Sequence, residues 1–165
     1  MKERALAITH GVTDPGQALN RLREYLQALV LRSLHESEAF RPLAFVGGTA
    51  LRFLHGLPRF SEDLDFSVVS SGGYDGKEWM TKVKRDLALA GFAPEVTWND
   101  RRTVQVGWVR VAGILRDAGL SGLPQQKLAI KVEIDTRPPV GVRCERRVVT
   151  RQSVTFLLQH HDLPP

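Results

Sequence analysis

Two aspartates separated by one residue are the chemically most suggestive pair in this chain. Asp63 and Asp65 stand at the start of residues 63–69, a segment whose composition suits a β-strand. Side chains alternate between the two faces of a strand, so both carboxylates are expected on one face. Two such charges about 4 Å apart repel by roughly 4 kcal/mol at an effective dielectric constant of 20. Mg²⁺ removes this repulsion and favours one or two carboxylates with phosphate oxygens and water. The pair indicates a magnesium site; the simpler alternative is a solvated strand edge, or neutralisation by Arg52 or Arg59.

A second acidic segment lies further along the chain. Residues 127–135 alternate between aliphatic side chains on one face and Lys131, Glu133 and Asp135 on the other. The aliphatic face commits this strand to the core, so the charged face is either solvated or part of a functional pocket. A third carboxylate is what a two-metal site needs to bind a second ion and activate an attacking hydroxyl. Glu133 and Asp135 are both candidates for it.

A glycine pair precedes the aspartates. Gly47 and Gly48 separate an apolar run, residues 43–46, from a helical pattern that begins at Thr49. Glycine lets the backbone approach a ligand closely, and N–H groups at a helix start attract anions. This turn could hold a phosphate chain, with the Thr49 hydroxyl as a further donor. A tight turn with a threonine cap is the structural alternative.

The remaining pattern predicts the elements that must position these residues. Thr13-Asp14-Pro15 marks the start of a long helix with leucines at helical spacing. Residues 112–126 show no clear pattern, and Pro138-Pro139 is expected to stop the strand at 127–135. The order of elements is typical of an α+β or mixed α/β fold, in which helices flank a small mixed sheet on one face. The other predicted elements are strands at 43–46, 63–69, 94–98, 103–111 and 127–135, and helices at 49–54 and around 79–87 with Gly91 as the C-terminal cap.

Composition sets the broad class. The chain has 165 residues, of which 42% are hydrophobic and 25% charged, which suits one globular domain. No apolar stretch reaches the roughly 20 residues that a membrane span needs, so a cytoplasmic location is expected. Cys144 is the only cysteine, which excludes an internal disulfide and a cysteine-built zinc site. The net charge of +5 favours an anionic partner such as a nucleotide or nucleic acid.

The ordered set of motifs resembles a known family. The stretch from Phe45 to Leu54 and the string Arg59-Phe-Ser-Glu-Asp-Leu-Asp-Phe66 closely resemble the AbiEii/AbiGii-type nucleotidyltransferases, toxins of type IV toxin–antitoxin systems. Residues Ile130–Pro139 are similar to the family's later strand motif. The resemblance implies a polymerase-β-like nucleotidyltransferase core, a mixed sheet that carries the carboxylates and is flanked by helices.

The resemblance also implies residue roles. Asp63 and Asp65 would bind Mg²⁺, with Glu133 as the first choice for the third carboxylate and Asp135 as the alternative. The other expected nucleotide contacts are Gly47, Gly48 and Thr49 to the triphosphate, with Arg59, Ser61 and Lys131 as further contacts.

The implied activity is metal-dependent transfer of a nucleoside monophosphate from an NTP to an acceptor, notably tRNA or another RNA. A nucleotide-binding module without transfer activity and a small-molecule nucleotidyltransferase are the alternatives. Relatives usually continue into a helical part, which would start near Gln159, so residues 1–165 are expected to form a single nucleotidyltransferase domain without it. Trp79, Trp98 and Trp108 are expected to be core or sheet-face aromatics, with Trp108 the first to consider for stacking on a base.

Overall fold

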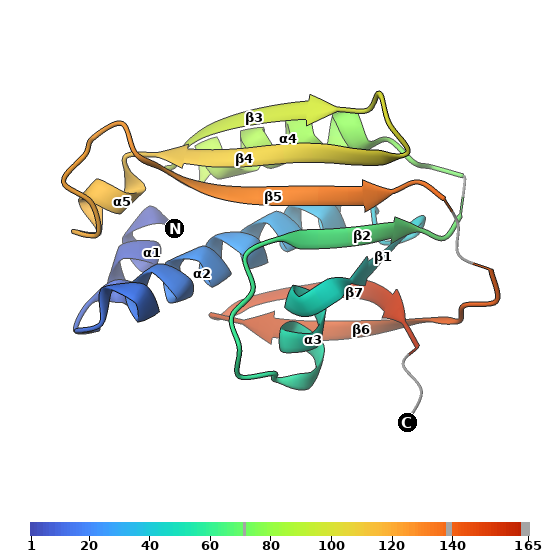
Figure 1. The fold of residues 1–165 in the computed structure, drawn as a ribbon, viewed down its shortest axis with the longest axis horizontal. Helices are drawn as coiled ribbons and strands as arrows, with labels where there is room; N and C mark the ends of the chain where they lie inside the picture. The colour runs from blue at the N-terminus through green and yellow to red at the C-terminus, as the bar shows by residue number, and fades with distance from the viewer. Residues whose placement is uncertain (71, 138–139, 163–165) are drawn as a thin grey trace.

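A seven-stranded mixed sheet organises the computed structural model, which describes residues 1–70, 72–137 and 140–162 (Figure 1). The strand order is β3-β4-β5-β2-β1-β7-β6. No helix in these three ranges combines the length and the apolar character that a membrane crossing requires. The elements in chain order are α1 Lys2–Thr9, α2 Pro15–Glu36, β1 Leu43–Val46, α3 Gly47–His55, β2 Leu64–Val68, α4 Gly76–Leu89, β3 Ala93–Asn99, β4 Val104–Ala112, α5 Ile114–Asp117, β5 Lys127–Asp135, β6 Cys144–Arg151 and β7 Val154–His161.

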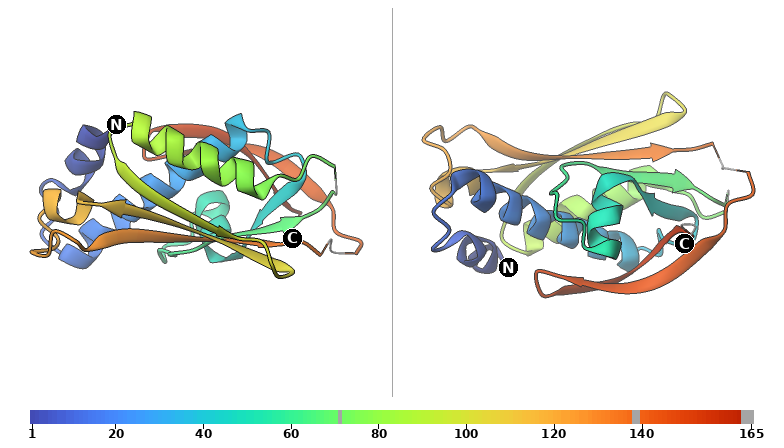
Figure 2. Two further views of the ribbon diagram at one scale, coloured as in Figure 1. Left: turned by 90° about the horizontal axis from the view of Figure 1, so that it is seen from above. Right: turned by 60° about the horizontal axis from the view of Figure 1, so that its bottom comes forward.

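The centre of the sheet joins strands that are far apart in sequence. β2 pairs with β5 in parallel and with β1 antiparallel, while β1 pairs in parallel with β7. The two outer parts are antiparallel hairpins, β3-β4 and β6-β7. α2 and α4 cover the same face of the sheet, and the opposite face of β3, β4 and β5 carries no helix (Figures 1 and 2). The charged residues of β5 lie on that uncovered face.

Helix α2 forms as its sequence predicts. Asp14 caps it by accepting a hydrogen bond from the Gly16 backbone N–H at 3.0 Å, and Pro15 occupies the first turn. Leu22 and Leu26 are fully buried. The apolar face of α2 therefore forms the centre of the core beneath the sheet.

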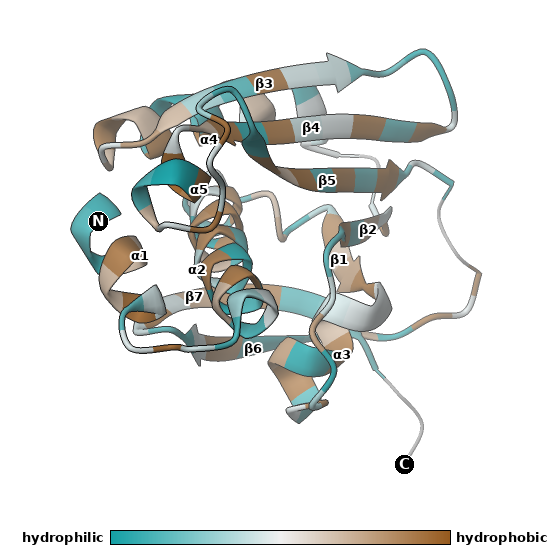
Figure 3. Cartoon of the chain, turned by 60° about the vertical axis from the view of Figure 1, so that its left-hand side comes forward, coloured by the Kyte–Doolittle hydropathy of each residue, from teal (hydrophilic) through white to brown (hydrophobic). Residues whose placement is uncertain are grey.

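Strands β4 and β5 alternate as expected. The even-numbered residues of β5 from Leu128 to Ile134 are buried and the odd-numbered ones are partly exposed. In β4, Val109 and Val111 are buried, whereas Trp108 and Arg110 lie on the other face. Figure 3 shows that β4 carries both hydrophobic and hydrophilic residues along its length. One face of these strands thus builds the core and the other is available for a site.

The α+β fold class is confirmed, and the sheet is larger than the sequence indicated. β6 and β7 add a hairpin at one edge, and β7 includes Gln159, where a helical part was expected to begin. The unassigned stretch 112–126 contains the short helix α5. β5 ends at Asp135, while Pro138 and Pro139, expected to stop it, lie outside the described residues.

Candidate active site

The central feature of the site is a pair of carboxylates on neighbouring strands. In the parallel β2–β5 pairing, Asp65 is the direct partner of Glu133. Paired residues of adjacent strands point to the same face, and the strands are about 4.8 Å apart. The Nζ atom of Lys131 lies 2.6 Å from Oε1 of Glu133 on that face. The structure therefore brings together Asp65, Glu133 and Lys131 on one face of the sheet.

The Asp65 carboxyl is held in an unfavourable environment for its charge. Burial, followed by the negative charges of Glu133 and Asp63, raises its pKa to about 6, although Lys131 opposes this shift. A carboxylate kept next to two others costs folding free energy. A bound cation would recover that cost, and such strain is typical of functional sites.

The backbone of Gly47 lies close to the side chain of Asp65. Gly47 has a positive φ of +81°, and a Cβ at this position would lie 2.7 Å from Oδ2 of Asp65. A Cβ on Gly48 would lie 3.2 Å from Oγ of Ser61. Both glycines thus allow the start of α3 to approach the acidic strand and the loop before it, which a larger residue would prevent.

A cleft of about 420 Å³ lies beside this turn. Gly48, Arg59 and Ser61 line it together with neighbouring residues of the loop that leads into β2. This volume falls in the range of small-molecule sites, roughly 300–1,000 Å³. Three residues that were expected to contact the nucleotide therefore share one cleft.

Thr49 is placed differently from the expectation. Its side chain is buried, with the residue only 1% exposed, and its hydroxyl donates to the backbone carbonyl oxygen of Asp63. This hydroxyl is not accessible to a phosphate. Thr49 instead ties the start of α3 to the residue that precedes β2.

Asp135 also lies apart from the pair. It pairs with Ser67, two positions beyond the Asp65–Glu133 pair, and accepts hydrogen bonds from the backbone and guanidinium of Arg137. These hydrogen bonds lower the pKa of Asp135. Of the two candidates for the third carboxylate, Glu133 is the one beside Asp65.

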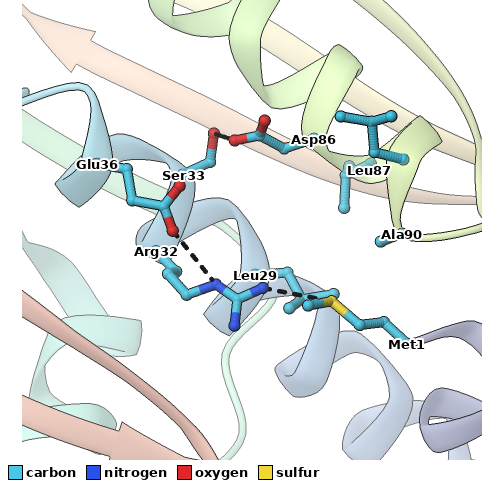
Figure 4. Close-up of a pocket in the computed structure, with 9 residues that line it drawn as sticks. Met1, Leu29, Arg32, Ser33, Glu36, Asp86, Leu87 and Ala90 are labelled. Carbon is cyan, nitrogen blue, oxygen red and sulfur yellow. Dashed lines mark hydrogen bonds and ion pairs between the residues drawn. The ribbon is translucent and has the colours of Figure 1, made fainter.

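A second cavity, of about 310 Å³, lies between α2 and α4 and contains none of the expected site residues. Ser33 donates to Asp86 across it at 2.7 Å, and Arg32 pairs with Glu36 at 3.7 Å (Figure 4). It is separate from the carboxylate pair, because α2 and α4 cover the opposite face of the sheet.

Comparison with protein families decides the classification. The model of the family described as nucleotidyl transferase AbiEii toxin, type IV TA system, matches residues 29–158. The chain belongs to the AbiEii family. The match includes the glycine turn, the aspartates and the β5 strand. The segments that build the site therefore lie inside the matched AbiEii region.

Two solved structures are similar to this AbiEii chain. It is similar to a nucleotidyltransferase candidate from H. pylori, with 25% identity and a TM-score of 0.52 over 84% of this chain and 52% of that one. It also matches JHP933 from Helicobacter pylori, with 26% identity and a TM-score of 0.46 over 77% of this chain and 48% of that one. The chain thus spans about half the length of these proteins. No curated protein matches.

The donor set fits a hard divalent cation. Within the described ranges, no group of three histidine, cysteine, aspartate or glutamate side chains is arranged to hold a metal ion. Asp65 lies beside Glu133 and feels the negative charge of Asp63, which precedes β2 with an exposed side chain. A metal site shared by all three carboxylates therefore stays a prediction. Asp65 with one further carboxylate still satisfies Mg²⁺, which takes its remaining ligands from phosphate and water.

Residues on α2 and α3 of this AbiEii chain have supporting roles that its sequence did not predict, and Arg52, considered above as a charge partner of the aspartates, contacts Glu24 instead. Gln27 is 1% exposed and its side-chain amide donates to the carbonyl oxygens of Ser61 and Glu62 at 3.0 and 2.9 Å. Arg52 pairs with the buried carboxylate of Glu24 and donates to the Leu57 carbonyl oxygen at 2.9 Å. These contacts fix the loop before Asp63. A polar residue inside an apolar helical pattern was the only signal for them.

Proposed function

We propose that this chain is the metal- and nucleotide-binding core of a nucleotidyltransferase that moves a nucleoside monophosphate from an NTP to RNA, with tRNA as the first candidate. The observation that carries the proposal is the Asp65–Glu133 pair beside Gly47. Membership of the AbiEii family supports it and supports a role as the toxin of a type IV toxin–antitoxin system, acting in the cytoplasm where its substrates are.

The triphosphate would lie on the α3 side of the carboxylates. Gly48 and Ser61 provide a close backbone approach and a hydroxyl in the same cleft, and Arg59 adds a positive charge. Helix N-termini and arginine side chains both bind phosphate groups well. This arrangement would place the α-phosphate near Asp65.

Asp65 and Glu133 are the residues proposed to hold Mg²⁺, with Asp63 as a further ligand. The ion, when bound, would neutralise the carboxylates and the phosphate oxygens. The acceptor hydroxyl oxygen bonds to the α-phosphorus, and the bond from that phosphorus to the β-phosphate oxygen breaks, which releases pyrophosphate. Glu133 accepts the hydroxyl proton, and Lys131 holds its carboxylate in place at 2.6 Å.

A transfer assay tests this function. The protein is incubated with each labelled NTP, Mg²⁺ and total RNA, and label in RNA is measured for the wild type, Asp65→Asn and Glu133→Gln. We expect either variant to lose about a hundredfold or more of the activity, since each removes a group that acts at the reacting phosphate. Glu145→Gln, an exposed carboxylate on β6, is the matched control and should retain full activity.

Equal transfer by the wild type and Asp65→Asn would refute the proposed site. Mg²⁺-dependent NTP binding in calorimetry without label transfer to any RNA would instead support the binding-module alternative. Folding of each variant is verified by circular dichroism, so that a loss of activity reports on the site.

A further inference from the structure

Trp108 lies on the face of the sheet that no helix covers. It is a β4 residue, and its direct partner on β5 is Lys131. The neighbouring β4 residues Gly107 and Val109 face the core, where a Cβ on Gly107 would lie 2.8 Å from Met80. Trp98 packs against the core, whereas Trp108 is half-buried on the other face and does not pack against the core cluster. The core therefore does not account for this large aromatic side chain.

Two cations lie over the Trp108 ring. The guanidinium carbon of Arg110 lies 4.8 Å from the ring centroid, and Nζ of Lys131 lies 5.8 Å from it. Both distances lie within the range of cation–π contact, about 6 Å. An aromatic ring with positive charges beside it is a combination that binds single-stranded nucleic acid, because bases stack on an accessible ring face and phosphates pair with the cations.

This group, Trp108 with Arg110 and Lys131, is called the Trp108 platform below. It is continuous with the carboxylate pair, because Lys131 also contacts Glu133. The strand order β4-β5-β2-β1 puts the platform and the Gly47 turn on opposite sides of that pair. Strand spacings put Trp108 and Asp65 on the order of 12 Å apart.

We propose that the Trp108 platform binds the single-stranded RNA acceptor, with one base stacked on Trp108 and phosphates at Arg110 and Lys131. This inference rests on the proposed function, and it names the side from which the acceptor enters. The triphosphate cleft with Gly48 and Arg59 lies on the other side of the Asp65–Glu133 pair. The platform therefore belongs to the acceptor and not to the base of the NTP.

Binding of a labelled single-stranded RNA oligonucleotide, measured by fluorescence anisotropy without NTP, tests the platform. Trp108→Leu keeps an apolar side chain but cannot stack, and we expect it to weaken RNA binding about tenfold. Trp108→Phe keeps an aromatic ring and should bind within about threefold of the wild type. If the role were only structural, the two variants would not differ in this way.

A charge-matched pair tests the cations. Arg110→Ala should weaken RNA binding and reduce the slope of log affinity against log salt by about one. Arg146→Ala removes the same charge from β6 at the far edge of the sheet and should change neither quantity. If both variants weaken RNA binding equally, the RNA is held by general electrostatic attraction and the proposal of a specific platform is overturned.

Calorimetry with Mg²⁺ and each NTP tests whether Trp108 contacts the RNA acceptor or the nucleotide. We expect Trp108→Leu to bind NTP as the wild type does; a loss of NTP affinity with unchanged RNA affinity would assign the ring to the nucleotide base and overturn the proposal. Wild-type RNA affinity in Trp108→Leu would also overturn it, while transfer activity in that variant would leave the proposed function intact. If RNA binds through Trp108 but no nucleotide is transferred to it, the proposed transfer function is refuted and the RNA-binding role of the Trp108 platform stands.

Discussion

The side-chain amide of Gln27 donates a hydrogen bond to the backbone carbonyl oxygen of Ser61 across 3.0 Å. The same amide reaches the next carbonyl oxygen, that of Glu62, at 2.9 Å. Two consecutive carbonyl groups in the loop before Asp63 are thus held by one buried residue of α2. The position of the acidic strand depends on this helix as well as on the sheet.

Removal of this amide should loosen the loop. Gln27→Ala leaves both carbonyl groups without their partner and should lower the free energy of unfolding by about 1–3 kcal/mol. It should also raise the Mg²⁺ concentration needed for half-maximal transfer. At temperatures far below the melting temperature, a purely global loss of stability would leave this concentration unchanged. Urea unfolding and Mg²⁺ titration of activity measure the two effects. Gln17→Ala, at an exposed position on the same helix, should change neither.

Substitution of Asp65 should stabilise the protein while it abolishes transfer. Because the folded-state pKa is raised to about 6 from 3.8, the charged carboxylate costs stability. That cost is complete above pH about 6 and disappears as the pH falls towards 3.8. Discounted for partial exposure, Asp65→Asn should add about 1–2 kcal/mol at pH 8 and less at pH 5. Urea unfolding at both pH values measures this, and a destabilised variant at pH 8 would contradict the proposed strain.

Mg²⁺ should stabilise the wild type through the same residue. At a concentration about ten times the dissociation constant, binding adds roughly 1.4 kcal/mol, which corresponds to about 2–6 °C in melting temperature for a domain of this size. Differential scanning fluorimetry with and without MgCl₂ measures the shift, and EDTA should reverse it. Asp65→Asn should show no shift; an equal shift in wild type and variant would place the ion elsewhere.

Two glycine substitutions separate backbone strain from contact with the site. Gly47 and Gly56 both have a positive φ, but only a Cβ on Gly47 meets the Asp65 carboxylate; on Gly56 nothing lies within 4 Å. Gly56→Ala should cost about 1 kcal/mol and leave transfer intact. Gly47→Ala should cost more and abolish transfer, because the new methyl group displaces Asp65. Equal stability and activity of the two variants would show that the close approach has no role.

Local patterns were sufficient to predict the elements that carry the site. The strict alternation of residues 127–135 and the capped leucine pattern of α2 both depend on neighbours in sequence, and the structure contains both elements. The direct pairing of Asp65 with Glu133 depends on the choice of sheet neighbours, which no local pattern encodes. The burial of the Thr49 hydroxyl and the contacts of Gln27 depend on how helices dock, so the sequence does not predict their partners.

The parallel neighbours β2 and β5 belong to distant parts of the chain, with helix α4 and a whole hairpin strand pair between them in sequence. During synthesis Asp65 leaves the ribosome long before Glu133 does, and pairing over such a separation forms slowly. A nascent polypeptide that still lacks β5 has only half of the proposed site, so under the proposed function it would not yet transfer a nucleotide. Proteolytic cleavage between β2 and β5, followed by separation of the two fragments, would likewise divide the proposed site.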